Sequence, residues 1–335
     1  MAVLAKNPEF TSDQELRQSI HKTLNKENWS RSPSRAVWPL VAYILIAINL
    51  KLSQLYLNDQ INGFLLFVSI IITGNFGTSF FFLLHEIMHG AIFKNKKLKW
   101  FFAYLCACGC LVTPYLWRQW HNWHHKYTAG PLDTDRMRNP VYDNFADKIQ
   151  RLHNKFKRFS IYDPISWAVG VFALPSHHIL MALEVVSGDA KFSANKPRVI
   201  LETVAVYLVA ILPLLMMDFA VVLLGIYSPM VISSCICSLY ILTNHNNNPL
   251  TTKNVTLLNS TSVNLDPFTL SSHFNFGRHI EHHLFPAVSH DKLKPVTVYL
   301  RENHSSEFNE LNFFKCIGYI FGRPKDFNQK VETIN

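Results

Sequence analysis

Four apolar runs constrain this chain more than any other feature of its sequence. They cover residues 36–57, 62–84, 199–217 and 219–243, and each is long enough to cross a hydrocarbon core of about 30 Å as an α-helix. The composition agrees, with 49% hydrophobic and 16% charged residues in 335. Short polar connections around Asn58–Asp59 and Asp218 join the runs in pairs. The sequence therefore predicts an all-α integral membrane protein with four transmembrane helices in two hairpins.

Two further apolar runs, 99–117 and 164–186, are weaker candidates for spans. Pro114 interrupts the first, and Pro175, His177 and His178 interrupt the second. We interpret both as interfacial or re-entrant helices. The expected organisation is an N-terminal segment over 1–35, a membrane core over 36–290 and a C-terminal segment over 291–335.

The basic residues indicate how the chain is oriented. The formal net charge is +9, and Lys and Arg crowd the segment 94–158 while the two short hairpin connections carry almost none. The positive-inside rule then places both termini and the long middle segment in the cytoplasm. Because these charges flank apolar runs, we expect them to meet anionic lipid head groups, and we expect no nucleic acid partner. The six cysteines lie mostly within apolar runs without CxxC spacing, which is typical of small buried side chains.

Histidines carry the chemistry of this sequence. Residues at i, i+3 and i+4 share one face of a helix, so an HxxxH motif offers two imidazoles to a metal and an HxxHH motif offers three. The sixteen histidines include one HxxxH motif, two HxxHH motifs and a separate residue after the fourth apolar run. These nine residues are His85 and His89, then His121, His124 and His125, then His279, His282 and His283, and finally His245.

The number of boxed histidines indicates two metal ions. Eight imidazoles exceed what one tetrahedral zinc ion uses, since a catalytic zinc takes about three protein ligands. Imidazole binds iron, copper, nickel and zinc, so the type of ligand does not identify the metal. A site fed by apolar helices suits a hydrocarbon substrate, and its oxidation requires a redox metal and dioxygen. Iron is the metal that we expect.

Topology adds a condition, because the three boxes must lie on one side of the membrane to build one site. They do so if 99–117 and 164–186 do not cross. The prediction is then a cytoplasmic helical cap that holds a His-rich dimetal site.

Two other classes of protein remain open at this point. The sequence HEIMH also fits the HExxH pattern of zinc proteases, in which the glutamate, here Glu86, is the general base. That class leaves HNWHH and HIEHH without a role. A non-catalytic metal carrier is the other, although a carrier has no reason to pair HxxHH motifs so regularly.

At these motifs the chain resembles the membrane fatty acid desaturase and hydroxylase superfamily, whose signature is HxxxH, HxxHH and HxxHH at similar separations. HHKYTAGPLDTD and HIEHHLFP look like the acyl desaturase branch. The resemblance covers about 36–290 and implies a di-iron centre bound by the eight boxed histidines, with His245 as an additional ligand. Glu86 and Glu281 are expected to orient ring N–H groups rather than bind iron. Asp133, Asp135 and Asn244 are expected to assist the ligands.

The resemblance also implies a reaction. It predicts dioxygen-dependent desaturation of a fatty acyl chain linked to lipid, coenzyme A or acyl carrier protein, with a hydroxylase, ketolase or acetylenase as the alternatives. No haem-binding pattern of a fused b-type cytochrome is present, so electrons would come from a separate ferredoxin or b-type cytochrome at the basic surface. The C-terminal sequence KVETIN contains no retention motif, which favours a bacterial inner membrane over the endoplasmic reticulum.

Some histidines and aromatic residues receive no role from the sequence. His177 and His178 are adjacent, and adjacent helical residues point about 100° apart, so the two cannot share a ligand face. His273 is interpreted as a helix-surface residue, and His290 carries no functional prediction. The tryptophans of WRQWHNW fit either a chain-binding tunnel or an aromatic belt at the membrane interface.

Overall fold

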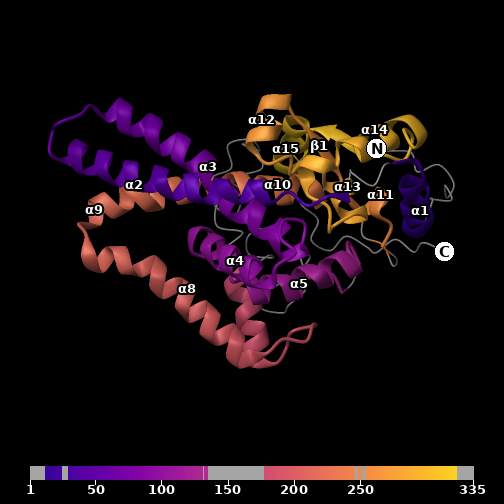
Figure 1. Ribbon diagram of the computed structural model, residues 1–335, viewed down its shortest axis with the longest axis horizontal. Helices are drawn as coiled ribbons and strands as arrows, with labels where there is room; N and C mark the ends of the chain where they lie inside the picture. The colour runs from indigo at the N-terminus through magenta and orange to yellow at the C-terminus, as the bar shows by residue number, and fades with distance from the viewer. Residues whose placement is uncertain are drawn as a thin grey trace.

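The chain folds into a bundle of long apolar helices with a polar cap at one end (Figure 1). The computed structural model describes residues 12–24, 29–130, 132–134, 177–245, 248–249, 251 and 254–322. Four helices in this part are long and apolar enough to cross a membrane, namely Pro33–Leu57, Gly63–His89, Lys196–Met216 and Phe219–His245. The predicted fold class, a helical membrane protein with four transmembrane helices and a histidine-rich site, is confirmed.

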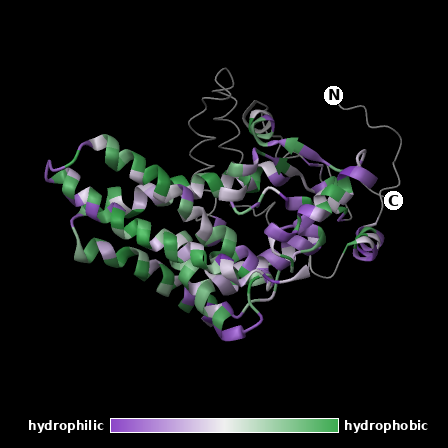
Figure 2. Cartoon of the chain, turned by 45° about the horizontal axis from the view of Figure 1, so that its top comes forward, coloured by the Kyte–Doolittle hydropathy of each residue, from purple (hydrophilic) through white to green (hydrophobic). Residues whose placement is uncertain are grey.

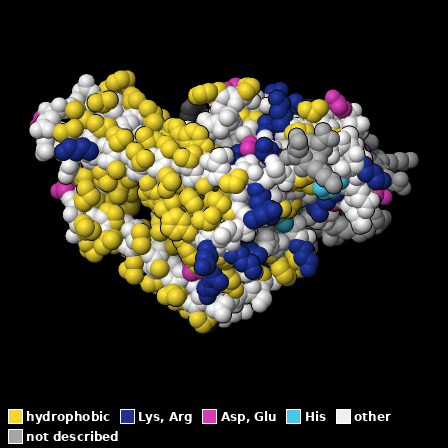
Figure 3. Space-filling model, viewed as in Figure 1, with side chains coloured by type: hydrophobic (Ala, Val, Ile, Leu, Met, Phe, Trp, Pro, Cys, Tyr) yellow, Lys and Arg dark blue, Asp and Glu magenta, His cyan; other side chains and the backbone are white. Residues whose placement is uncertain are grey.

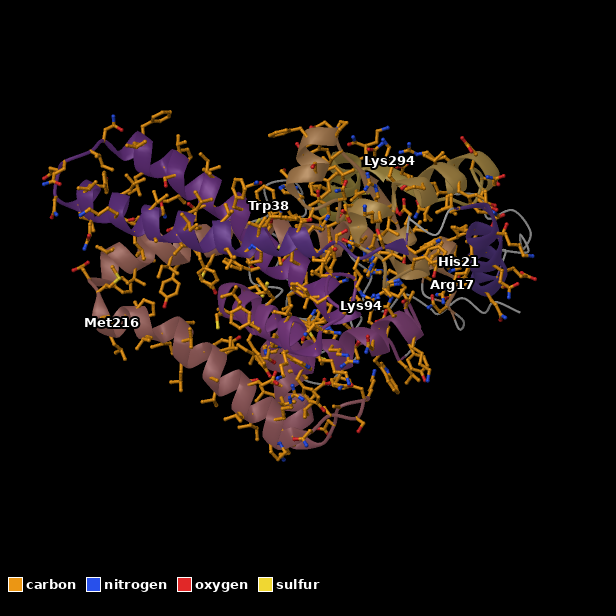
Figure 4. All side chains as sticks on the ribbon, in the orientation of Figure 1. Arg17, His21, Trp38, Lys94, Met216 and Lys294 are labelled. Atoms are coloured by element: carbon orange, nitrogen blue, oxygen red, sulfur yellow. The ribbon has the colours of Figure 1, made fainter. Side chains whose placement is uncertain are left out.

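The helices pair as two hairpins. A 3-10 turn η2 (Pro33–Ala36) leads into α2 (Val37–Leu57), which is followed by α3 (Gly63–His89). The second hairpin is α8 (Lys196–Met216) followed by α9 (Phe219–Val222), η4 (Leu223–Tyr227) and α10 (Ser228–His245). Both hairpin turns lie at the left end in Figure 1, where Figure 4 labels Met216, and the cap lies at the right. Figure 2 shows the long helices mostly hydrophobic and the cap mixed.

Small residues let α3 and α10 approach closely. A Cβ at Gly74 would lie 2.7 Å from the side chain of Ile232, and one at Gly77 would lie 3.2 Å from Ser233. Close backbone contact of this kind is the usual basis of helix packing in lipid. η4 is a π-helical turn, and the Nδ2 of Asn49 on α2 donates to the carbonyl oxygens of Leu224 and Gly225 at 3.1 Å each. This polar contact satisfies carbonyl groups that the π-turn leaves irregular.

The weaker apolar run at 99–117 is not one straight helix. It falls on α4 (Lys96–Cys110) and the start of α5 (Pro114–Tyr127), and the two helices are bent by 91°. Leu111 takes a left-handed conformation (φ 58°), and Pro114 opens α5 at a position where its missing N–H is tolerated. Of the run at 164–186, residues 164–176 lie outside the described part and the remainder belongs to a short apolar helix, His177–Ser187. Whether either run lies in the membrane interface stays a prediction.

The cap gathers short elements from both ends of the chain. From the C-terminal half come α11 (Thr256–Asn259), α12 (Pro267–Ser272), α13 (His279–Leu284), η5 (His290–Lys292), α14 (Lys294–Asn303) and α15 (Phe313–Gly322), and the N-terminal segment adds α1 (Asp13–Thr23). Strands β1 (Ser262–Asn264) and β2 (Glu310–Asn312) pair in parallel, with Val263 opposite Leu311. The sequence did not predict these strands, because three residues are too few for a periodic pattern and the partners are far apart in the chain.

Candidate metal centre

The first histidine box forms the last turn of α3. The helix continues past the apolar run that ends at residue 84 and stops at His89, where Gly90 takes a left-handed conformation (φ 83°). His85 and His89 are four residues apart, so both side chains leave the same face of the helix. His85 is buried and His89 is half-buried. The end of α3 therefore presents two imidazoles to the interior of the cap.

The second box lies on α5 and divides between two directions. Nε2 of His121 lies 3.0 Å from Nε2 of His85 and 3.0 Å from Nε2 of His125. His124 faces away from this group, and its ring centroid is 4.6 Å from that of His245 and 5.1 Å from that of His283. Because successive helical residues point about 100° apart, His124 and His125 cannot face one point.

The third box, on α13, divides in the same way. Nε2 of His279 lies 2.6 Å from Nε2 of His245, which ends α10, and 3.0 Å from Nε2 of His283. His282 turns to the other side, where its Nε2 lies 3.2 Å from Nε2 of His125. The i and i+4 residues of each HxxHH motif thus go to one group, and the i+3 residue goes to the other.

Two clusters of imidazoles result. In each, ligand nitrogens of the core members lie within 4.8 Å of one another. The three imidazoles of an HxxHH motif do not gather in one cluster, because the helix geometry separates its adjacent histidines. The first cluster consists of His85, His89, His121, His125 and His282. The second cluster consists of His124, His245 and His283, which His279 joins through its contacts with His245 and His283.

The nitrogen atoms in these clusters fit metal ligands better than a hydrogen-bond network. Nε2 of His121 has two other Nε2 atoms at hydrogen-bond distance, as does Nε2 of His279. In a neutral imidazole, Nε2 carries either one hydrogen or one lone pair, so the central Nε2 of each group cannot form a good hydrogen bond with both of its neighbours. Nε2 of His89 is buried and has no hydrogen-bond partner within the described chain. A cation in each cluster would relieve both features.

Burial keeps the imidazoles in the form that binds metal. Burial, followed by the charges of neighbouring histidines, lowers the pKa of His279, His282 and His283 well below the ordinary value of 6.5. The rings are therefore neutral at neutral pH, as ligands must be.

One carboxylate supports the second cluster. Oδ1 of Asp133 lies 2.7 Å from Nδ1 of His124, and both side chains are buried. The backbone N–H of Ala129 donates to the other carboxylate oxygen at 2.7 Å. The aspartate can accept the Nδ1 proton and so leave Nε2 of His124 free to bind a metal. The role expected of Asp133 stays a prediction, and Asp135 lies outside the described residues.

The two glutamates within the boxes do not touch the imidazoles of either cluster. Glu281 accepts from the hydroxyls of Ser262 and Thr297, both at 2.5 Å, which ties α13 to β1 and α14. Burial raises the pKa of Glu281. Glu86 accepts from Arg35 at 2.6 Å and from Ser289. We expected both glutamates to orient the rings of metal ligands, but their carboxylates contact other side chains instead.

His290 is the residue that sequence reasoning missed. Its ring is fully buried and lies between the rings of His282 and Phe276, with centroids 4.7 and 5.2 Å away and planes tilted by 15° and 21°. Its Nδ1 is 3.2 Å from Oε1 of Glu86. Glu86 therefore supports a neighbour of the first cluster rather than a ligand. The sequence contained little sign of this, because His290 stands alone outside any box.

Asn244 and α1 complete the surroundings of the second cluster. Asn244 is fully buried beside His245, and neither side-chain amide atom has a hydrogen-bond partner within the described chain. Arg17 of α1, labelled in Figure 4, donates to the carbonyl oxygen of His283 at 3.3 Å. Thr256 donates to the carboxylate of Asp13 through its backbone N–H and its hydroxyl. The N-terminal segment, for which the sequence predicted no role, thus packs on the third box.

A comparison with protein families bears on this geometry. The family model for fatty acid desaturase matches residues 62–310, which is most of the chain and includes all nine clustered histidines. The chain belongs to the fatty acid desaturase family. No individual curated protein gives a significant match. This desaturase-family protein is accordingly a multi-pass membrane oxidoreductase with histidine clusters capable of binding metal.

Proposed function

We propose that the protein is a dioxygen-dependent fatty acyl desaturase with a non-haem di-iron centre. The observation that carries the proposal is the pair of all-imidazole clusters, one with five histidines and one with four. The nine clustered histidines would hold the iron, which would supply redox chemistry for dioxygen reduction and C–H oxidation. Loss of two hydrogens from neighbouring carbons forms the double bond, and dioxygen with two external electrons and two protons leaves as two waters.

The chain's own residues would hold the ions in a fixed arrangement. The first cluster would bind one iron through its five imidazoles, and the second cluster would bind the other. Asp133 would fix the tautomer of His124, and the stacked ring of His290 would hold His282 in place.

The zinc protease alternative is disfavoured by the surroundings of Glu86. Its carboxylate accepts from Arg35 and Ser289 and faces His290, so both oxygens are engaged. A general base needs a free oxygen within reach of the attacking water. His85 and His89 also share their cluster with three histidines from the other boxes, which a single protease zinc does not need.

A hydroxylase, ketolase or acetylenase of the same superfamily remains the alternative reaction. These activities would use the same ligands and differ in how the substrate radical is handled. We propose desaturation because the sequence resembles the acyl desaturase branch at HIEHHLFP.

Electrons would come from a separate protein. A ferredoxin or a b-type cytochrome would meet the cap on the face that carries the basic residues, where opposite charge speeds encounter. By the positive-inside rule this face is cytoplasmic.

The decisive experiment pairs metal analysis with lipid analysis. The detergent-purified protein is assayed for iron and zinc, and the fatty acids of expressing cells are separated by gas chromatography. About two irons per chain with new unsaturated chains support the proposal. Zinc as the only metal with an unchanged lipid profile would contradict it, and new hydroxylated or acetylenic chains would favour the alternative reactions.

A further inference from the structure

Two cations from separate elements bind the end of α3, beside the first cluster, and a third, Arg118, acts on one of them through its charge. Nζ of Lys99 donates to the carbonyl oxygen of Met88 at 2.7 Å, and Nε of Arg31 donates to that of Gly90 at 3.0 Å. These two carbonyls flank His89 in the chain. Partial burial, followed by the positive charges of Arg118 and Arg31, lowers the pKa of Lys99 to about 8. The charges of Arg31 and Arg118 are thus close enough to Lys99 to disfavour its own charge.

No carboxylate compensates for this repulsion. Within the described chain, no acidic side chain forms an ion pair with Arg31, Lys99 or Arg118. The carbonyl end of α3 offsets part of the charge, because cations are favourable at a helix C-terminus. Arg118 is exposed on α5 and forms no such contact. The charge of Arg118 is therefore available to bind an anionic ligand.

The first turn of α4 adds positive charge at an unfavourable place. Lys96 and Lys97 begin this helix, and its first turn contains no acidic residue. The N-terminus of a helix carries partial positive charge, so lysines there cost stability unless an anion is near. Asn95 already caps the backbone N–H groups of Lys97 and Leu98, so the lysine side chains themselves are what an anion would meet.

Apolar side chains continue from this basic group along the same helix. On α4, Leu98 directly follows the two lysines and is 46% exposed, and Phe101, one turn beyond Lys97, is 61% exposed. Figure 3 shows Lys and Arg side chains along the border between the hydrophobic surface of the spans and the rest of the molecule, and Figure 4 labels Lys94 in this region. A ligand that matches both surfaces is an amphiphile with a phosphate beside an acyl chain. A soluble acidic protein would match only the charge.

We propose that Arg31, Lys99 and Arg118, with Lys96 and Lys97, form a phosphate site that holds the head group of a phospholipid beside His89. The inference rests on the proposed function in one respect: the bound phospholipid is then the carrier of the acyl substrate. It goes further by naming that carrier and the residues that recognise it. The ammonium and guanidinium groups of this site would recognise a phosphate monoester or diester through charge-assisted hydrogen bonds.

The test uses two ligands that differ only in the phosphate. Dioctanoyl phosphatidic acid and dioctanoylglycerol are titrated into the full-length protein, purified in neutral detergent without added metal, and binding is followed by thermal shift. We expect phosphatidic acid to bind more tightly than dioctanoylglycerol. Arg118→Gln and Lys97→Gln each remove one exposed cation without breaking a side-chain bond of the described chain, and each should weaken phosphatidic acid binding about fivefold. Lys315→Gln, an exposed lysine on α15, is the matched control and should change nothing.

Other occupants of the site give different results. Equal affinities for the two lipids, or variants indistinguishable from the control, would overturn the inference. If octanoyl-coenzyme A loses affinity in the variants while phosphatidic acid does not, the phosphate belongs to coenzyme A and the phospholipid is excluded. If only electron transfer from an acidic ferredoxin slows, the surface docks a protein.

The outcome is separable from the proposed function. Lipid binding requires neither added iron nor turnover, so its absence refutes the phosphate site alone. Intact phosphate-dependent binding in a protein that holds iron but alters no acyl chain would refute the desaturase and leave the site in place.

Discussion

Oδ1 of Asp133 lies 2.7 Å from Nδ1 of His124, and the two buried side chains connect the loop after α5 to the second cluster. The contact fixes which nitrogen of His124 carries the proton. Since the ring has one ligand nitrogen to offer, the strength of the second cluster depends on this carboxylate. The first cluster has no comparable aspartate among the described contacts of its five histidines.

Replacing Asp133 should therefore weaken one metal site and spare the other. In Asp133→Ala we expect the affinity of the second cluster for iron to fall about 10- to 100-fold, the usual effect of removing a partner that orients a ligand. Iron retained after dialysis against a graded series of chelator concentrations measures the loss. Asp59→Asn in the α2–α3 turn is the control, because this exposed residue lies at the other end of the bundle. Equal loss from both clusters would contradict the assignment.

The division of the HxxHH motifs makes a second prediction. His125→Ala removes a ligand of the first cluster, whereas His283→Ala removes a ligand of the second. Each of His125→Ala and His283→Ala should retain about one iron per chain, and the double variant should retain none. Elemental analysis of the purified proteins gives the count, with His304→Ala in the cap as the control. A double variant that binds as much iron as either single variant would show that both residues serve one ion.

The sequence predicted which histidines matter but not how they are shared. Box spacing identified His121, His124 and His125 as one face of a helix, which is correct for the first and last of them. The 100° step between adjacent residues excluded a shared site for His177 and His178, and the same step separates His124 from His125. How the histidines divide between the two clusters depends on the positions of α3, α10 and α13 relative to α5. Tertiary placement of this kind leaves no periodic trace in a sequence.

Residues outside any motif could not be predicted for a related reason. The apolar runs predicted the four spans because an unbroken run of about twenty apolar residues is typical of a membrane-spanning helix. His290 and Arg17 belong to no motif, and each meets the site only because the segment after α13 or the N-terminal helix folds over it. Glu86 and Glu281 were recognised from their place in the boxes, yet the helix turns both carboxylates away from the clusters toward Arg35 and Ser262.

The buried ion pair between Arg35 and Glu86 leads to a third prediction. Arg35 is 8% exposed and Glu86 is 1% exposed, with Nη2 and Oε1 2.6 Å apart. Removing one partner of such a pair costs about 3 to 5 kcal/mol when the remaining buried charge has no other partner. Asp291 would still face Arg35, with Oδ1 3.7 Å from Nη1, and would offset part of this cost. Glu86→Gln should therefore lower the free energy of unfolding by less than about 3 to 5 kcal/mol, measured by denaturant titration in detergent micelles.

A double variant separates this effect from catalysis. Arg35→Met combined with Glu86→Met removes both charges and should recover much of the lost stability, since an apolar pair of similar volume is often tolerated. The zinc protease class instead requires Glu86 for chemistry. Full stability of Glu86→Gln together with loss of a proteolytic activity would support that class over the desaturase.

The last prediction concerns pH and the apolar helix His177–Ser187. His178 is fully buried, and burial followed by the charge of His177 lowers its pKa to about 3. The ring is at hydrogen-bond distance from Thr113, whose backbone N–H donates to Nε2 at 3.5 Å, and a protonated Nε2 could not accept this bond. In the unfolded chain the same ring titrates near 6.5.

The sign of the effect follows from these two values. Above pH 6.5 the ring is neutral in both states, so its contribution to stability is fully present. As the pH falls below 6.5 the unfolded chain takes up a proton that the folded protein refuses, and stability declines by about 1.4 kcal/mol per pH unit down to the folded pKa. His178→Gln should remove this part of the pH dependence between pH 6.5 and 4.5, as measured by unfolding in detergent at a series of pH values. An unaltered slope in His178→Gln would mean that His178 takes up its proton in the folded state as readily as in the unfolded chain, and that the contact with Thr113 does not hold the ring neutral.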